Sequence, residues 1–314
     1  MTSVRFGLTG VGSLPFADEA EAISHVKSCY SALPFTPELT QTSGESGMIA
    51  RMWPAELVES TDGGVRLSVD PDRIGEALRA KDLSALPFLD TVARRLRLSD
   101  GPEVAVHLAG PVTLLRATAT AAARGELWSH PRRREPACSY VAAIAAAVAT
   151  AARAAGRTAL IVLDEPLLAP PTIDVDNPAN LLLFSKIIQS VEEAGGRTGI
   201  HSCGTPPTAM LLHLDFSAAF FDARTYGGEL SSKRRTLERF LRRGGRIGYG
   251  VFDARDAADD LEAALTTLAS LPLCDGEGIF LTAACGTGNA SSAREAALVA
   301  ALVALRARLI GASA

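Results

Sequence analysis

The chain has 314 residues, with 31 lysines and arginines against 35 aspartates and glutamates, so its formal net charge is -4 at pH 7. This slightly acidic balance argues against nucleic-acid binding, which needs clustered basic residues, and favours small molecules or proteins as partners. With 47% hydrophobic and 21% charged residues the chain can bury a large core. We expect residues 1–314 to form a single domain.

Neither a disulfide framework nor a targeting segment is predicted. The five cysteines are too few and too scattered for such a framework. The N-terminal sequence MTSVRFGLTG lacks the basic and apolar regions of a signal peptide, so we expect a cytoplasmic protein. The most apolar long stretch, residues 140–155, is mostly alanine, is interrupted by Arg153 and is shorter than the ~20 residues that a membrane-spanning helix needs. We expect a packed helix there and no membrane association.

Short β-branched apolar runs alternate with longer helical patterns, which is typical of a parallel sheet with crossover helices. Strands are predicted at residues 6–9, 33–39, 104–108, 159–163, 198–201, 218–221, 247–252 and 279–282. Helices are predicted at residues 18–31, 74–97, 136–155, 181–194, 230–243, 256–271 and 291–309. The number of strands favours an α/β fold of the closed (β/α)8 type, a TIM barrel, over an open doubly wound sheet.

Two stretches near the N-terminus bear on this choice. Gly7, Gly10 and Gly12 lie around the end of the first predicted strand but are followed by Ser-Leu-Pro. They therefore do not complete the G-x-G-x-x-G motif of a dinucleotide-binding sheet. Residues 40–72 are rich in Thr, Ser, Glu and Gly, which predicts a long loop that is either functional or disordered.

Metal-ligating residue types follow several predicted strands, at the ends that face the mouth of a barrel. His201 and Cys203 are two positions apart at one strand end, so both side chains point to the same face. Cys285 and Asp222 follow two other strands. Imidazole, two thiolates and a carboxylate suit a tetrahedral zinc better than magnesium or calcium. The simpler alternative is that the cysteines only pack in the core.

The remaining cysteines and histidines have no comparable metal-ligating partners nearby in the sequence. We expect the cysteines on predicted helices or in a loop to be inert and the other histidines to be surface or packing residues; these are Cys29, Cys138 and Cys274, and His25, His107, His130 and His213.

An acidic pair, Asp164 and Glu165, follows the apolar strand around residues 160–163, and Pro166 ends that strand. One of the two acids could cap a helix. We favour a functional role, because a carboxylate buried at the mouth of a barrel needs a partner and can bind the ammonium group of a ligand. Glu45 lies within the long predicted loop and could equally be solvated.

The ordered set GVGSLP, SGES, AGPVTLL, VLDEP, HSC, FFDA, GVFDAR and AACG, from Gly10 to Gly286, resembles the catalytic C-terminal barrel of cobalamin-independent methionine synthase. The wider superfamily includes uroporphyrinogen decarboxylase and methylcobalamin:thiol methyltransferases. The resemblance implies a catalytic zinc bound by His201, Cys203, Asp222 and Cys285, with Asp222 where the family usually has Glu. It also implies that Val11 and Ser13 bind the carboxylate of homocysteine and that Glu45 and Asp164 bind its ammonium.

Three departures from the family concern the methyl donor. The tryptophan that follows the G-P-V-T turn is replaced by Leu115 and Arg116, and the histidine of the V-x-D-x-H motif is Arg255, which does not give up a proton near neutral pH. The N-terminal barrel that helps the family bind polyglutamylated folate is also not expected in this chain. We therefore expect a short core form that methylates homocysteine to methionine, using methylcobalamin or a methylated corrinoid protein in place of methyltetrahydrofolate.

Three alternatives remain open from the sequence. A related zinc enzyme could alkylate another thiol such as coenzyme M, although that thiol has no ammonium for Glu45 and Asp164. A porphyrinogen decarboxylase needs no metal and would leave HSC and AACG unexplained. A non-catalytic module that binds a corrinoid protein would hold its zinc in a closed site with four protein ligands.

Overall fold

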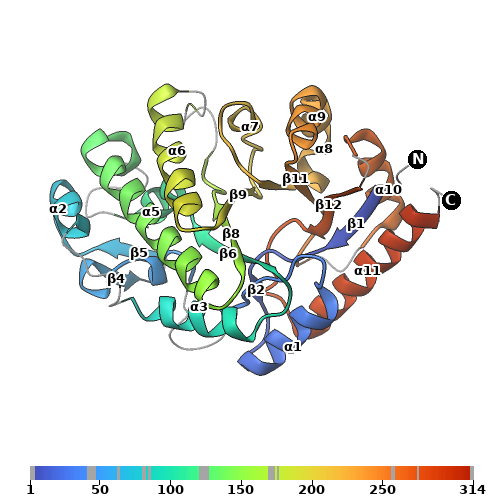
Figure 1. The fold of residues 1–314 in the computed structure, drawn as a ribbon, viewed down its shortest axis with the longest axis horizontal. Coiled ribbons are helices and arrows are strands. Elements are labelled where there is room, and N and C mark those ends of the chain that lie inside the picture. The colour runs from blue at the N-terminus through green and yellow to red at the C-terminus, as the bar shows by residue number, and fades with distance from the viewer. Residues whose placement is uncertain are drawn as a thin grey trace.

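The computed structural model describes residues 4–40, 47–61, 64–79, 83, 86–119, 127–168, 174, 177–255, 259–273 and 276–311. Its centre is a curled sheet of seven parallel strands in the order β1-β12-β11-β10-β9-β8-β6, surrounded by helices (Figure 1). The strands are β1 (Val4–Leu8), β6 (Glu103–Ala109), β8 (Thr158–Asp164), β9 (Arg197–Ser202), β10 (Ala218–Asp222), β11 (Arg246–Phe252) and β12 (Gly276–Ala283). The predicted (β/α)8 barrel class is confirmed.

The remaining strand of the ring, predicted at residues 33–39, is irregular. Phe35 forms an isolated parallel bridge with Ala105 of β6, and the Ala105 N–H donates to the carbonyl of Pro34 at 2.8 Å. Pro34 and Pro37 have no N–H to donate, so a continuous ladder cannot form along this segment. The prediction of a full strand was therefore wrong in detail but right in position.

The same segment also reaches the other edge of the sheet. The Thr9 hydroxyl, just after β1, donates to the carbonyl of Leu33 at 2.7 Å. Further along, the short strands β2 (Ser13–Leu14) and β3 (Glu38–Leu39) pair in parallel. Residues 33–39 thus bridge β1 and β6, which closes the ring and brings the loop after β1 against Glu38.

Helices cover the outside of the ring: α1 (Glu19–Cys29), α2 (Ile74–Arg79), α3 (Pro87–Leu98), α4 (Pro111–Ala117), α5 (Pro131–Ala154), α6 (Pro178–Glu193), α7 (Met210–His213), α8 (Ala223–Ser232), α9 (Arg234–Arg242), α10 (Leu261–Ser270) and α11 (Ser292–Gly311). The helix predicted at 74–97 is split, with Pro87 at the start of α3, because proline lacks the N–H that a helix interior uses. The helix predicted at 230–243 is likewise interrupted, at Lys233.

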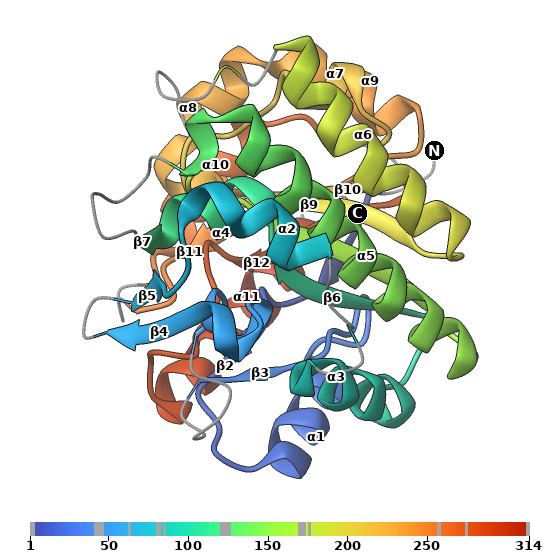
Figure 2. The ribbon, with the colours of Figure 1, turned by 90° about the vertical axis from the view of Figure 1, so that its left-hand side faces the viewer.

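The segment predicted as a long loop, residues 40–72, contains regular structure. Strands β4 (Val58–Thr61) and β5 (Gly64–Leu67) form an antiparallel pair that β7 (Thr118–Ala119) extends in parallel (Figure 2). Short 3-10 helices precede and follow the pair: η1 (Ala50–Met52), η2 (Ala55–Leu57) and η3 (Pro71–Arg73), and η5 (Leu127–Ser129) lies before α5.

Helix α5 is the described helix that is long and apolar enough to cross a membrane by length and composition. Of its apolar window 56% is buried inside the structure, and the helix packs against α6 and β8. A core helix passes the same test of length and composition. The expected packing of residues 140–155 is therefore confirmed.

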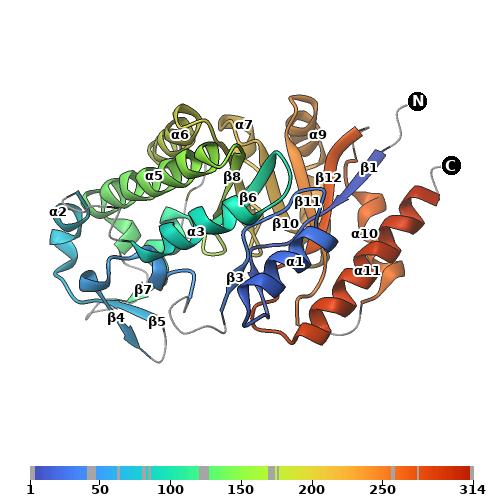
Figure 3. The same ribbon diagram turned by 60° about the horizontal axis from the view of Figure 1, so that its bottom comes forward.

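Helices α1 and α11 lie side by side (Figure 3) and are joined by a buried acid, Glu295 of α11. Its carboxylate accepts hydrogen bonds from Tyr30 Oη at 2.7 Å and Thr287 Oγ1 at 2.6 Å, and lies 2.8 Å from His25 Nε2. Burial raises the pKa of Glu295, but the bonds from His25, Thr287 and Tyr30 outweigh it and leave the pKa below the usual value. Thr287 belongs to the loop after β12, so this acid also fixes that loop.

Replacing Glu295 with glutamine should lower the free energy of unfolding at pH 7 by about 1–3 kcal/mol, the usual cost of weakening charge-assisted buried hydrogen bonds. Because its folded pKa is lowered, its stabilisation is complete above the ordinary glutamate pKa of about 4.3 and is lost as the pH falls through the folded value. The difference in melting temperature between wild type and Glu295→Gln should become smaller only below that pH. The exposed Glu193→Gln is the control, and a difference that grew on acidification would contradict this assignment.

Candidate functional site

A cavity of about 390 Å³ opens at the C-terminal ends of the strands. Its lining includes most of the residues that the sequence singled out: Val11, Ser13, Asp164, His201, Cys203 and Cys285. It also includes Gly12, Glu38, Thr40, Gly47, Met48, Pro166, Gly286 and Asn289. Residues from distant parts of the chain meet here because parallel strands bring their carboxyl ends to one side of the barrel.

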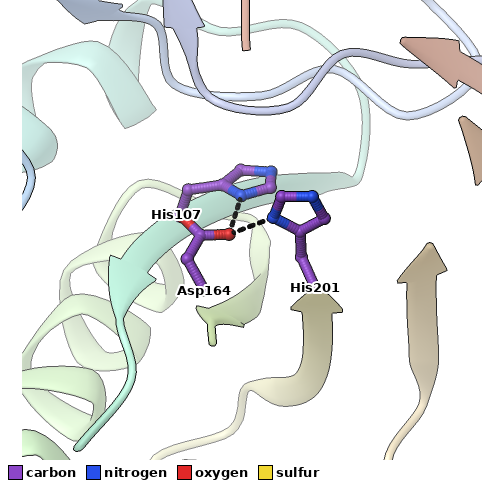
Figure 4. Close-up of side chains that lie close together, drawn as sticks. All are labelled: His107, Asp164 and His201. Atoms are coloured by element: carbon purple, nitrogen blue, oxygen red, sulfur yellow. Dashed lines mark hydrogen bonds and ion pairs between the residues drawn. The ribbon is translucent and has the colours of Figure 1, made fainter. Parts of the chain in front are cut away.

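Asp164 and His201 lie side by side in the barrel wall, at paired positions of β8 and β9. One carboxylate oxygen of Asp164, Oδ1, lies 2.8 Å from His201 Nδ1 and 2.9 Å from His107 Nδ1 (Figure 4). All three side chains are buried. The described group thus gathers two imidazoles and a carboxylate whose ligand atoms lie within 4.8 Å of one another, and it could hold a metal ion.

His107 is the member of this group that the sequence does not identify as a functional candidate. The sequence predicts a surface or packing residue; His107 is buried, but it has a polar partner 57 positions away. The available signal was a histidine inside the apolar run of β6, Glu103–Ala109. A polar side chain in the wall of a barrel needs a hydrogen-bond partner, and only the tertiary fold identifies it.

The charges in this group favour an ionised carboxylate. Burial raises the pKa of Asp164, but the charges and hydrogen bonds of His107 and His201 outweigh it and hold the pKa below the usual value. Burial lowers the pKa of His201, and the hydrogen bond and charge of Asp164 raise it above the usual value. Asp164 therefore offers a fixed negative charge behind the His201 ring.

The other ring nitrogen of His201 marks where a cation fits. If His201 Nδ1 carries the proton donated to Asp164, Nε2 of a neutral ring bears a lone pair. That Nε2 lies 3.3 Å from the carbonyl oxygen of Ala284, so two acceptors face each other. A proton or a metal ion at Nε2 relieves this conflict.

The thiols of Cys203 and Cys285 meet beside this ring, at the cavity wall. A hydrogen bond from Cys203 lowers the pKa of Cys285 below the usual value against the effect of desolvation, and the charge of His201 acts in the same direction. The pKa of Cys203 is raised by the same hydrogen bond and by burial. The cavity therefore presents two cysteine sulfurs and an imidazole, a donor set that fits zinc.

The predicted fourth ligand, Asp222, does not line the cavity. It ends β10 (Ala218–Asp222), and its Oδ1 accepts a hydrogen bond from the Thr225 N–H at 2.8 Å as the N-cap of α8. Strand alternation puts Asp222 on the same face as Phe220, which contacts the His107 ring inside the barrel. Direct metal binding by Asp222 stays a prediction.

The two acids at the end of β8, Asp164 and Glu165, have different roles. Asp164 faces the cavity, whereas Glu165 accepts hydrogen bonds from the Val112 N–H at 3.0 Å and from the Thr113 N–H and hydroxyl at 2.8 and 2.7 Å. Glu165 is thus the helix cap at the start of α4. Glu45, the other expected ammonium partner, lies outside the described residues.

A second carboxylate on the cavity wall, Glu38, was not predicted. It pairs with Ser13 across the short β2-β3 ladder. Arg51 forms an ion pair with Glu38 Oε1 through Nη2 and donates from the same nitrogen to the His107 carbonyl at 3.0 Å. Arg51 lies in the segment that the sequence assigned to a loop, so no periodic pattern pointed to it.

Arg116 and Arg255, which differ from the motifs of the family that the sequence resembles, are not among the residues that line the described cavity. Arg116 donates to the Leu167 carbonyl at 2.8 Å. Arg255 is exposed, and its backbone N–H donates to Asp253 Oδ1 at 2.7 Å. Neither belongs to the residues that form the cavity.

No family model and no curated protein matches this sequence. Solved structures do match. A vitamin-B12-independent methionine synthase-like protein of Listeria monocytogenes shares 15% identity over 99% of this chain and 98% of its own, with a TM-score of 0.53. A B12-independent methionine synthase from Shewanella sp. W3-18-1, solved with selenomethionine, shares 16% identity over 71% of this chain and 67% of its own, with a TM-score of 0.50. At these identities the similarity establishes the fold.

Proposed function

We propose that this protein is a zinc-dependent methyltransferase that methylates the thiol of homocysteine to give methionine. The observation that carries the proposal is the convergence of His201, Cys203 and Cys285 on one cavity that also contains Ser13 and Asp164. Zinc, when bound by His201, Cys203 and Cys285, would lower the pKa of a substrate thiol, so that a nucleophilic thiolate forms at neutral pH.

The chain's own residues would orient the substrate. Val11 lies on the loop after β1 and Ser13 begins β2, where a backbone N–H and a hydroxyl can bind a carboxylate. Asp164 and Glu38 place carboxylates on the cavity wall, where they can bind an ammonium group. Holding the carboxylate and the ammonium of the amino acid leaves the sulfur at the end of its side chain free to face Cys203 and Cys285, an effect of positioning. A sulfonate such as coenzyme M would instead meet two carboxylates.

We propose a methylated corrinoid, free or carried by a partner protein, as the methyl donor, because Arg255 replaces the acid expected to serve a folate leaving group. The zinc-loaded protein should form methionine from homocysteine and methylcobalamin, as measured by mass spectrometry. Turnover with methyltetrahydrofolate but none with methylcobalamin would contradict this choice of donor.

Replacing Glu38 with glutamine should raise the KM for homocysteine about tenfold and leave kcat nearly unchanged, because a bond to a charged group contributes about 1.5–3 kcal/mol to binding. Glutamine keeps an acceptor for Arg51 and so preserves the local fold. The matched substrate is 4-mercaptobutyrate, which lacks the ammonium group and should show no change in KM. An equal effect on both thiols would indicate that Glu38 is only structural.

A further inference from the structure

We propose that His107 is a positioning residue that acts on His201 through Asp164, so that His201 Nε2 stays aimed at the metal position beside Cys203 and Cys285. The proposal rests on the proposed function in one respect, namely that His201 is a metal ligand. His107 lies on a different strand from His201 and does not line the cavity.

The hydrogen bonds that connect the three residues share one atom. Asp164 Oδ1 accepts from both Nδ1 atoms, at 2.9 Å from His107 and 2.8 Å from His201 (Figure 4). The two rings stand edge to face, with centroids 6.1 Å apart. The side chains of His107 and His201 are 1% and 4% exposed, so water does not compete for these bonds.

A carboxylate with one donor can rotate about its last torsion, which has a broad energy profile. Two donors that converge on the same oxygen from different strands leave Asp164 a single orientation. That orientation keeps the proton of His201 on Nδ1 and its lone pair on Nε2. Histidine metal ligands commonly have such a carboxylate partner, and here a second imidazole holds the partner in place.

His107 is itself held on several sides. Arg51 Nη2 donates to its carbonyl at 3.0 Å. Its ring packs against Phe220 with centroids 6.4 Å apart. A methyl group added at Gly12 would lie 3.1 Å from His107 Cβ, so the loop after β1 closes over the side chain. The ring therefore has little freedom to move away from Asp164.

The other ring nitrogen of His107, Nε2, indicates that the ring's polar role is its hydrogen bond to Asp164. Nε2 is buried and has no hydrogen-bond partner among the described residues. An apolar side chain of similar volume would avoid the cost of this unpaired atom. The bond to Asp164 is thus the polar contact that the His107 ring makes, and leucine at this position should still allow folding.

Two variants separate positioning from packing. His107→Leu removes the donor, whereas His107→Asn keeps one, because asparagine Nδ2 sits where His Nδ1 does. By competition with a chelator, His107→Leu should bind zinc about 10- to 100-fold more weakly, the usual effect of losing a partner behind a metal ligand. His107→Asn should stay within about threefold of wild type, and the visible spectrum of the cobalt(II)-loaded protein should change only in His107→Leu. Equal zinc affinities and unchanged cobalt spectra in both variants would overturn the proposal.

A measurement on metal-free protein tests the same point without zinc or methyl transfer. In nitrogen-15 NMR of labelled histidines, His201 of the wild type and of His107→Asn should show a protonated Nδ1 bonded to a carboxylate. In His107→Leu, the His201 signals should no longer show a single form that is protonated at Nδ1. If His201 gives the same signals in all three proteins, His107 does not position it, even if the protein proves to be a methyltransferase. If the signals change but no zinc binds, the positioning stands and the proposed function fails.

Discussion

Replacing Cys203 or Cys285 with serine is expected to weaken zinc binding by at least about a hundredfold and to abolish methyl transfer. A zinc site held by four ligands is worth about 10–16 kcal/mol, so each thiolate contributes roughly 3 kcal/mol. A serine hydroxyl stays protonated near neutral pH and is a poor substitute for a thiolate. Zinc content after dialysis against a chelator of known affinity measures the effect.

The matched control is Cys29→Ser, because Cys29 is a free thiol on α1, outside the cavity lining. This variant should retain zinc and activity. Full zinc occupancy in both Cys203→Ser and Cys285→Ser would contradict the assignment of the centre and would direct attention to the buried group of His107, Asp164 and His201, whose ligand atoms also cluster.

Replacing Asp164 with asparagine is expected to have the second largest effect. The change keeps the shape of the side chain but removes the negative charge that accepts hydrogen bonds from both imidazoles. Zinc affinity should therefore fall about 10- to 100-fold. The KM for homocysteine should also rise, because Asp164 is one of the two described carboxylates on the cavity wall. Zinc competition and steady-state kinetics measure the two effects separately.

The neighbouring acid provides a control of the same type. Glu165→Gln weakens the cap of α4, where Glu165 binds two backbone N–H groups and a hydroxyl. It should lower the melting temperature and leave the zinc affinity of the folded protein unchanged. If both variants lost zinc to the same extent, the loss would reflect general destabilisation, and the separate role of Asp164 would be wrong.

The strands whose carboxyl ends hold the site residues could be predicted from the sequence, because buried parallel strands are continuous apolar runs that end in polar residues. It therefore located His201, Cys203 and Cys285 at one end of a barrel. The segment at 33–39 was harder to predict, because Pro34 and Pro37 interrupt its ladder while its neighbours on both sides still hold it in place. In contrast, the split of the predicted helix at Pro87 could have been predicted from the missing N–H of proline alone.

Partners that lie far apart in the sequence could not be predicted. His107 and Asp164 are 57 positions apart, and Arg51 reaches Glu38 from a segment without a clear period. Composition and spacing alone could not tell which acid of the pair at the end of β8 faces the site, and only the family resemblance assigned Asp164 to it. The register of β8 with β9 decides it, because it sets Asp164 opposite His201.

These contacts form one connected structure around the cavity. Arg51 links Glu38 to the backbone of His107, and His107 is linked through Asp164 to His201. The wall that would bind the amino acid is thus joined to the wall that would bind the metal. A change in one is expected to alter the other, which double-mutant cycles of Glu38 and Asp164 can measure.

The most direct test of the proposed zinc site is X-ray absorption at the zinc edge, recorded on the zinc-loaded protein with and without homocysteine. We predict that homocysteine adds a sulfur ligand to a centre that already contains two cysteine sulfurs and an imidazole nitrogen. The same number of sulfur ligands in both spectra would contradict it and would indicate a closed, structural zinc site.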